Sequence, residues 1–466
     1  VGNGAGYNLA GASNCVLIGD EAGVNINNAN SNGTVAIGHE ALKSMVAYPG
    51  NTAIGHKAGT AMTSNIGNTI IGYDAFKSAD YFEDYNVVIG YNAGAAINHA
   101  NADDNVLVGY NAGYGGANAL RQCVAIGSNA LDATGGNAVT GIVAIGYNAL
   151  TEMTSGNSNV AIGYEAMKVH TTGGNNIAIG YGAMDDTDAG STSLGSESNV
   201  FIGGDSGGGT WADAASRYNV CLGVATLSDA LNGADGNVAI GYQTGRYVTT
   251  GDNNVFVGTQ AGYDITTGGS NVLLGAEAGN NASTLGNSIG IGFQSLGGAN
   301  STLLTGDNAT VAIGYQALGN LSGNAGNGVY IGYLAGNHDT NGGNVAVGYR
   351  AMEVASGSGM THNTAVGIMA MNNISYNNSS ANTAIGYNAL KGGAVTSHVQ
   401  YNVAIGATNL QSITGGTNNV AIGGNSVLSA LTTGGSNVAI SRGAGQSVTT
   451  TSQCILIGAD SGNTLD

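Results

Sequence analysis

The sequence predicts an all-β protein, a parallel β-solenoid (β-roll) of about 25 coils. Three observations support this fold class. A short phrase recurs along the whole chain, its base period is 17 residues, and glycine and asparagine fill the positions between its apolar runs. The phrase is clearest in residues 159–164, Asn-Val-Ala-Ile-Gly-Tyr, and it returns seventeen residues later as Asn-Ile-Ala-Ile-Gly-Tyr in residues 176–181.

The glycine that closes each phrase measures the period. Its positions run from Gly2 to Gly458, with Ser441 replacing one glycine, and they define 25 intervals with a mean of about 18 residues. Ten intervals are 17 residues long, so the longer intervals contain insertions. At roughly 3.3 Å per residue, seventeen residues accommodate two short strands and two turns, which is one coil of a solenoid.

Each coil is expected to contain a Val-Ala-Ile strand, a glycine corner, a second segment beginning Tyr-x-Ala-Leu, and a polar return. Gly and Asn tolerate positive φ and therefore suit the corners. The chain has 82 glycines but only one proline, so nearly every backbone N–H can pair. Residues 1–466 are predicted to form a single continuous solenoid with both ends cut within a repeat, and residues 181–236 contain the largest insertions.

The two faces of the strand indicate self-association. Val160 and Ile162 share one face and Ala161 lies on the other; we expect valine and isoleucine inside the coil and alanine outside. Because the middle position is apolar along nearly the whole chain, both faces are apolar, which is typical of strands buried on both sides. This pattern predicts a homotrimer, intertwined or packed about a common axis. The alternative is a monomeric solenoid whose outer face is covered by inserted loops.

Composition excludes several kinds of partner. Only 8% of residues are charged and the net charge is −18, which disfavours nucleic acid because phosphate binding needs clustered cations. No apolar run approaches the roughly 18 residues of a membrane span, so no membrane insertion is expected. The four cysteines are too far apart along the predicted solenoid to form disulfides, and they lack the spacing of a zinc site.

No motif supports catalysis or a cofactor. Residues 204–208, Gly-Asp-Ser-Gly-Gly, are similar to the nucleophile loop of serine proteases, but the repeat explains them as a variant of its own turn. The seven histidines form no metal motif, and Asp185, Asp186 and Asp188 lack a calcium-binding pattern. We expect no enzyme activity, no cofactor and no metal. Two other functions are disfavoured. An ice-binding surface would need a threonine array on the strands, whereas the threonines cluster in the return turns. A polysaccharide-cleaving enzyme would need a carboxylate cluster at coil spacing, which the sequence lacks.

Aromatic residues provide the candidate surface features. A tyrosine commonly follows the corner glycine, which predicts a ladder of stacked rings along one corner; a platform for sugar rings is the alternative. The ladder is represented by Tyr147, Tyr164, Tyr181 and Tyr242, beside the strand residues Val160, Ala161 and Ile162. The inserted bulges supply the candidate binding residues, because loops on a rigid scaffold commonly bind ligands. These residues are Trp211, Arg217, Tyr218 and His398.

The repeat resembles those of bacteriophage tail-fibre-type proteins, and it is similar to the shorter repeat in the YadA-like head of trimeric autotransporter adhesins. The resemblance rests on phrases such as residues 51–55, 237–242 and 382–390. It implies a trimeric, left-handed parallel β-roll in an extracellular attachment fibre on a virion surface, with the chain itself and a host-surface glycan or protein as partners. The alternative it implies is a bacterial surface adhesin. The self-cleaving chaperone of such tail fibres and the stalk and anchor of the autotransporters are absent from this sequence.

Overall fold

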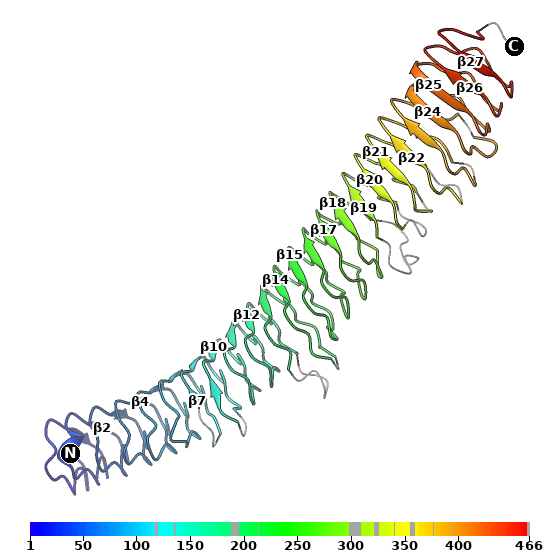
Figure 1. Cartoon of the computed structure of the whole chain (residues 1–466). Helices are drawn as coiled ribbons and strands as arrows, with labels where there is room; N and C mark the ends of the chain where they lie inside the picture. Colours follow the sequence, from blue (N-terminus) through cyan, green and yellow to red (C-terminus); the bar gives the residue numbers. More distant parts are fainter. Residues whose placement is uncertain are drawn as a thin grey trace. The chain divides into compact units, whose positions relative to one another are not determined.

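The computed structural model is an all-β parallel solenoid of about 23 turns, with a spacing of about 17–18 residues between turns (Figure 1). It describes the chain except for residues 117–119, 135–136, 188–194, 213, 298–308, 321–325, 340, 355–358, 376, 394 and 464–466. The chain divides into two compact units, Val1–Gly236 and Asn237–Asp466. The first unit ends where the insertion-rich residues 181–236 end.

Each coil contributes one short parallel strand, here called a rung, to a sheet. The rungs of the first unit are β1 (Val16–Ile18), β2 (Val35–Ile37), β3 (Thr52–Ile54), β4 (Thr69–Ile71), β5 (Val87–Ile89), β6 (Val106–Val108), β8 (Val124–Ile126), β10 (Val143–Ile145), β11 (Val160–Ile162), β12 (Ile177–Ile179), β13 (Val200–Ile202) and β14 (Val220–Leu222). This unit also contains the short pair β7 (Leu120–Arg121) and β9 (Val139–Thr140), and a 3₁₀ turn, η1 (Ala29–Ser31).

The second unit repeats the same arrangement. Its rungs are β15 (Val238–Ile240), β16 (Val255–Val257), β17 (Val272–Leu274), β18 (Ile289–Ile291), β19 (Val311–Ile313), β20 (Val329–Ile331), β21 (Val345–Val347), β22 (Thr364–Val366), β23 (Thr383–Ile385), β24 (Val403–Ala407), β25 (Val420–Asn425), β26 (Val438–Ile440) and β27 (Ile455–Ile457).

Rungs pair in strict register. Val160, Ala161 and Ile162 of β11 pair with Ile177, Ala178 and Ile179 of β12, and the same one-to-one pairing recurs between successive rungs in each unit. Every position of the phrase therefore lies directly above its own equivalent. The pair β24 and β25 shows a register shift just after Ile405.

The faces of the rungs are the reverse of the sequence expectation. Ala161 is fully buried inside the coil, whereas Val160 and Ile162 lie on the outer face and are partly exposed. The prediction that valine and isoleucine fill the interior was wrong. The physical reason is space, because a coil of 17 residues is narrow and its opposite wall leaves room only for a small side chain at most rungs.

Larger middle residues are accommodated by a matching loss of volume across the coil. Phe201 occupies the alanine position of β13, and the residue six positions later is Gly207 instead of the usual Leu or Met. A Cβ on Gly207 would lie 2.7 Å from the Phe201 ring. The same exchange pairs Phe256 with Gly262. In these two coils the aromatic ring thus occupies the space that a Leu or Met side chain would otherwise take, as close packing requires.

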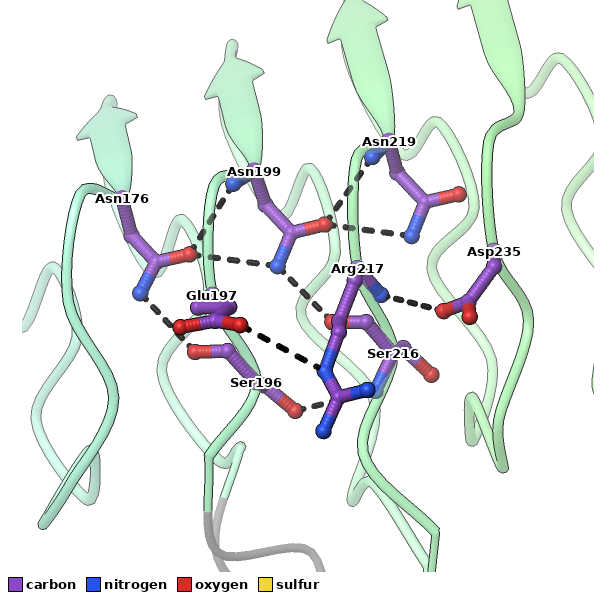
Figure 2. Close-up of polar contacts among 8 residues, drawn as sticks. All are labelled: Asn176, Ser196, Glu197, Asn199, Ser216, Arg217, Asn219 and Asp235. Atoms are coloured by element: carbon purple, nitrogen blue, oxygen red, sulfur yellow. Dashed lines mark hydrogen bonds and ion pairs between the residues drawn. The ribbon is translucent and has the colours of Figure 1, made fainter.

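A buried asparagine ladder joins coils at the position before most rungs (Figure 2). Asn176 Oδ1 accepts from both the backbone N–H and Nδ2 of Asn199, each at 3.1 Å, and Asn199 Oδ1 accepts in the same way from Asn219 at 3.0 and 3.1 Å. The second amide hydrogen of Asn199 goes to the carbonyl of Ser216 at 2.9 Å. Each buried amide therefore uses its donors and its acceptor, which removes the cost of burying it.

The ladder occurs in runs that end where another residue takes the asparagine position. By ladder position, the runs are Asn51, Asn68, Asn86 and Asn105; Asn159, Asn176, Asn199, Asn219, Asn237, Asn254 and Asn271; and Asn344, Asn363, Asn382, Asn402, Asn419 and Asn437. The residue that follows a run needs only a backbone N–H, which donates to the side-chain oxygen of the last asparagine. Cys123, for example, donates its N–H to Asn105 Oδ1 at 3.0 Å.

The corner glycine is required by both conformation and space. Gly163 has φ +144°, a region that side chains rarely adopt, and a Cβ there would clash with the carbonyl oxygen of Gly180 in the next coil. This contact recurs at successive corners, so the coils approach one another through bare backbone at this edge.

We predict that Asn199→Ala lowers the free energy of unfolding by about 2–4 kcal/mol, because it removes the acceptor of the buried Asn219 backbone N–H and the side-chain donor of the buried Ser216 carbonyl. Urea unfolding followed by circular dichroism measures the loss. Asn27→Ala, which removes an exposed amide from a residue without positive φ, is the matched control and should cost well under 1 kcal/mol. Equal losses in the two variants would contradict the structural role of the ladder.

Candidate functional site

An apolar outer face runs along the rungs of each unit. We define the strand-face stripe as the first and third residues of the 25 rungs of the main sheet, which makes fifty positions. Forty-six of them are Val, Ile or Leu, four are Thr, and none is charged. None of the fifty is buried, and Ile71, Ile240 and Ile385 are 36%, 37% and 39% exposed.

A second feature follows the corner glycine. The residues at this position form the aromatic row, and their rings stack on one another from coil to coil. Centroid separations are 4.6–5.7 Å and interplanar angles stay between 6° and 23°. The stacks are His39, His56, Tyr73, Tyr91 and Tyr110; Tyr147, Tyr164 and Tyr181; and, in the second unit, Phe293, Tyr315, Tyr333 and Tyr349. Tyr242, expected in the same ladder, is 51% exposed.

A row of polar side chains follows the aromatic row, one residue later in each coil, and we call it the amide row. Asn129 Nδ2 donates to Asn148 Oδ1 at 3.1 Å, and Gln316 Nε2 donates to Gln294 Oε1 at 2.6 Å. Where the row carries a carboxylate, a cation often lies three residues later, as in Lys168 with Glu165 at 3.2 Å. These exposed ion pairs contribute little to stability, but they neutralise charge on a strongly acidic chain.

Trp211 does not form part of any exposed binding surface. Its side chain is fully buried, its Nε1 donates to the carbonyl of Gly207 at 3.0 Å, and its ring packs on Phe201 at 5.7 Å. The prediction that Trp211 is the first binding residue was therefore wrong. Gly207 leaves space beside Phe201, and the inserted loop turns its one large aromatic side chain inward to pack there.

The other predicted binding residues are divided between the two units, with Arg217 and Tyr218 in the first and His398 in the second. Arg217 and Tyr218 lie on the return beside the asparagine ladder, with the Arg217 Nε 3.8 Å from Glu197 Oε1 (Figure 2) and Tyr218 60% exposed. The Arg217 backbone N–H donates to Asp235 Oδ1 at 2.6 Å. His398 is exposed and belongs to the second unit. The structure thus brings Arg217 and Tyr218 together between two carboxylates, an arrangement that suits a solvated turn.

Sequence reasoning missed a buried polar cluster in β20. Tyr330 fills the alanine position, and its ring lies over Gly328, which replaces the ladder asparagine. The Tyr330 hydroxyl donates to Asp339 Oδ2 at 2.7 Å, and Asn344 Nδ2 donates to the same oxygen at 2.8 Å. Burial raises the pKa of Asp339. The cluster restarts the ladder at Asn344, so we assign it a structural role.

The buried thiol of Cys123 is a poor nucleophile. None of the four forms a disulfide in the described part of the chain. Burial raises the pKa of Cys123 to about 11, so its thiol stays protonated at neutral pH. Cys123 Sγ donates to the carbonyl of Arg121 at 3.2 Å, as a small, buried, inert side chain does.

Within the described ranges, no group of three or more His, Cys, Asp or Glu side chains is placed to hold a metal ion. No helix in that part of the chain is long and apolar enough to cross a bilayer. Asp188, the third residue of the acidic cluster, lies outside the described residues. Comparison of the chain with protein-family models and with curated proteins gave no match.

Because Trp211 is buried, Trp211→Ala is expected to destabilise the first unit by about 3–5 kcal/mol through the cavity it leaves. Tyr218→Ala, which removes a mostly exposed ring, should change the free energy of unfolding by less than about 0.5 kcal/mol. Thermal unfolding of both variants makes the comparison. A Trp211→Ala protein as stable as the wild type would show that the loop does not anchor to the core.

The ionisation of Asp185 should make the stability of the first unit depend on pH. Burial, together with the charges of Asp186 and Asp205, raises its pKa from 3.8 to about 6. Its folded-state pKa is above the unfolded value, so its stabilising contribution is complete below about pH 4 and is lost as pH rises through about 6. Asp185→Asn should therefore flatten the fall in melting temperature between pH 4 and pH 7. Asp104→Asn, which removes an exposed carboxylate, is the control, and an unaltered slope in Asp185→Asn would contradict the assignment.

Proposed function

We propose that this chain is a structural and adhesive segment of an extracellular attachment fibre of the phage tail-fibre type. In this proposal three copies associate through the strand-face stripe, and the fibre makes contact with a host surface. Its action is mechanical, because a stiff repeat scaffold carries several weak contacts at once.

The observation that carries the proposal is the exclusion of charge from the strand-face stripe. The fifty positions are solvent-facing in a single chain, yet they hold no charged residue and only four threonines. Soluble monomers rarely expose contiguous apolar patches larger than a few hundred Å², and this stripe is continuous from rung to rung within each unit. A second copy of the same regular face is the natural cover, since its apolar rows have the same spacing.

The correction of the strand faces alters the basis for self-association. With alanine inside, the outward residues are Val, Ile and Leu, which are larger and more apolar than the expected alanine. Their burial between copies would therefore contribute more to the free energy of association. The number of copies rests on the resemblance to tail fibres and trimeric adhesins, and so does the attachment role.

Location distinguishes the two candidate systems. Gold-labelled antibody against the chain should decorate the tail fibres of virus particles in electron micrographs. Label on intact bacterial envelopes would instead support the surface-adhesin alternative. Label on neither would contradict an attachment fibre.

We predict that the wild-type chain sediments at three times its chain mass, and that a double variant, Ile162→Lys with Ile179→Lys, sediments at the mass of one chain. The two lysines place charge at neighbouring rungs of the stripe without disturbing the coil interior. Glu152→Lys, on the exposed return, is the charge-matched control and should keep the wild-type mass. A wild-type protein that sediments as a monomer would overturn the proposed assembly.

A further inference from the structure

The stacked rings of the aromatic row expose their edges, because each interior ring is covered on both faces by its neighbours. Tyr91, for instance, lies 5.1 Å from Tyr73 and 5.7 Å from Tyr110, with interplanar angles of 6° and 15°. A ligand that stacks on ring faces can therefore bind only where a stack ends. This constraint restricts the possible recognition sites to very few positions.

One such position has two open ring faces opposite each other. The first stack ends at Tyr110 and the second begins at Tyr147, and Ser128 occupies the row position of the single coil between them. The coils are adjacent, since β6 pairs with β8 and β8 pairs with β10 in register. Two rungs at about 4.8 Å each place the two ring planes roughly 9–10 Å apart. One inserted ring would lie about 5 Å from each tyrosine, within the usual stacking range.

The sides of this gap are chemically distinct. Ser128 contributes a short hydroxyl side chain that makes no hydrogen bond within the described residues. Next to it, Asn129 belongs to the amide row, bonded to Asn111 at 3.5 Å and to Asn148 at 3.1 Å, and a side-chain amide retains a second donor hydrogen and a second lone pair. Ile126, two residues before Ser128, is 38% exposed. The gap thus offers two aromatic faces, one apolar side chain and a row of polar groups.

We propose that the gap between Tyr110 and Tyr147 is a carbohydrate subsite that takes a single pyranose ring. A pyranose has two faces carrying C–H groups, which suit the two tyrosine rings, and an edge of hydroxyls, which suits Ser128 and the amide row. A purely apolar ring would leave these polar groups without new partners, so the polar side favours a sugar.

The corresponding break in the second unit shows what a closed gap looks like. Tyr349 and Tyr387 are also separated by one coil, but Ile368 occupies the intervening row position and is 50% exposed. Its branched side chain is larger than that of Ser128, so we expect it to leave less room between the two rings. The chain therefore offers its own internal comparison for the serine gap.

The subsite is independent of the fibre assembly proposed above, and one experiment tests it. Saturation-transfer NMR is recorded on the full chain with methyl β-D-glucopyranoside, methyl β-D-galactopyranoside and methyl N-acetyl-β-D-glucosaminide. Mannitol, an acyclic polyol with the same hydroxyl chemistry but no ring, is the ligand control. At least one pyranoside should receive saturation, and mannitol should not.

Ser128→Tyr is the decisive variant, because it completes the stack and fills the gap without threatening the fold. It should abolish the pyranoside signal while leaving the melting temperature at or above that of the wild type. Tyr110→Ala should weaken binding at least tenfold, whereas Tyr218→Ala, distant from the row, should bind as the wild type does. Ser128→Ile, which copies the closed gap of the second unit, should behave as Ser128→Tyr does.

Two results would overturn the subsite. One is a wild-type protein that shows no transfer to any of the three pyranosides, and the other is a pyranoside signal that survives in Ser128→Tyr. A fall in the sedimenting mass of Ser128→Tyr, without any wild-type sugar signal, would mean that another copy of the chain fills the gap. The wild-type sedimenting mass is measured separately, so failure of the subsite and failure of the assembly can be told apart.

Discussion

Every coil of this protein contacts a near copy of itself, in register, about 4.8 Å away. Each position of the phrase must therefore be compatible with its own repetition. Glycine satisfies this demand at the corner, where a side chain would strike the next carbonyl, and asparagine satisfies it before most rungs, where one amide can both accept from and donate to another. Tyrosine and histidine satisfy it by stacking. The narrow composition of the chain follows from this rule.

The period, the strand position and the corner were accessible from the sequence because the 17-residue spacing leaves few alternatives. The faces were not, since Val160, Ala161 and Ile162 make both faces of the rung apolar, and alternation alone does not say which one is inside. A usable signal was present. In Phe201 with Gly207 and in Phe256 with Gly262, an aromatic middle residue is accompanied by a glycine six positions later, and such an exchange of volume indicates residues that share an interior.

The sequence was likewise insufficient to decide which of the candidate binding residues are exposed and which are buried. Arg217 and Tyr218 are exposed as a loop position suggests, but Trp211 is in the core, because an inserted segment long enough to fold back can bury its largest side chain. The replacement of Asn at position 328 by Gly is readable from the sequence as a break in the ladder. Its compensation by Tyr330 and Asp339 is not, since it depends on a hydroxyl that reaches across the coil. Local exceptions to a repeat need the three-dimensional packing to be interpreted.

The asparagine ladder has a direction. From Asn159 to Asn219, the side-chain oxygen of the earlier coil always receives the N–H and the amide of the later one. A polypeptide emerging from the ribosome presents its earlier coils first, so each newly made coil meets an acceptor that is already in place. The ladder of hydrogen bonds can thus grow by templated addition in the order of synthesis, and each new coil also supplies the carbonyl that accepts the second amide hydrogen of the coil before it.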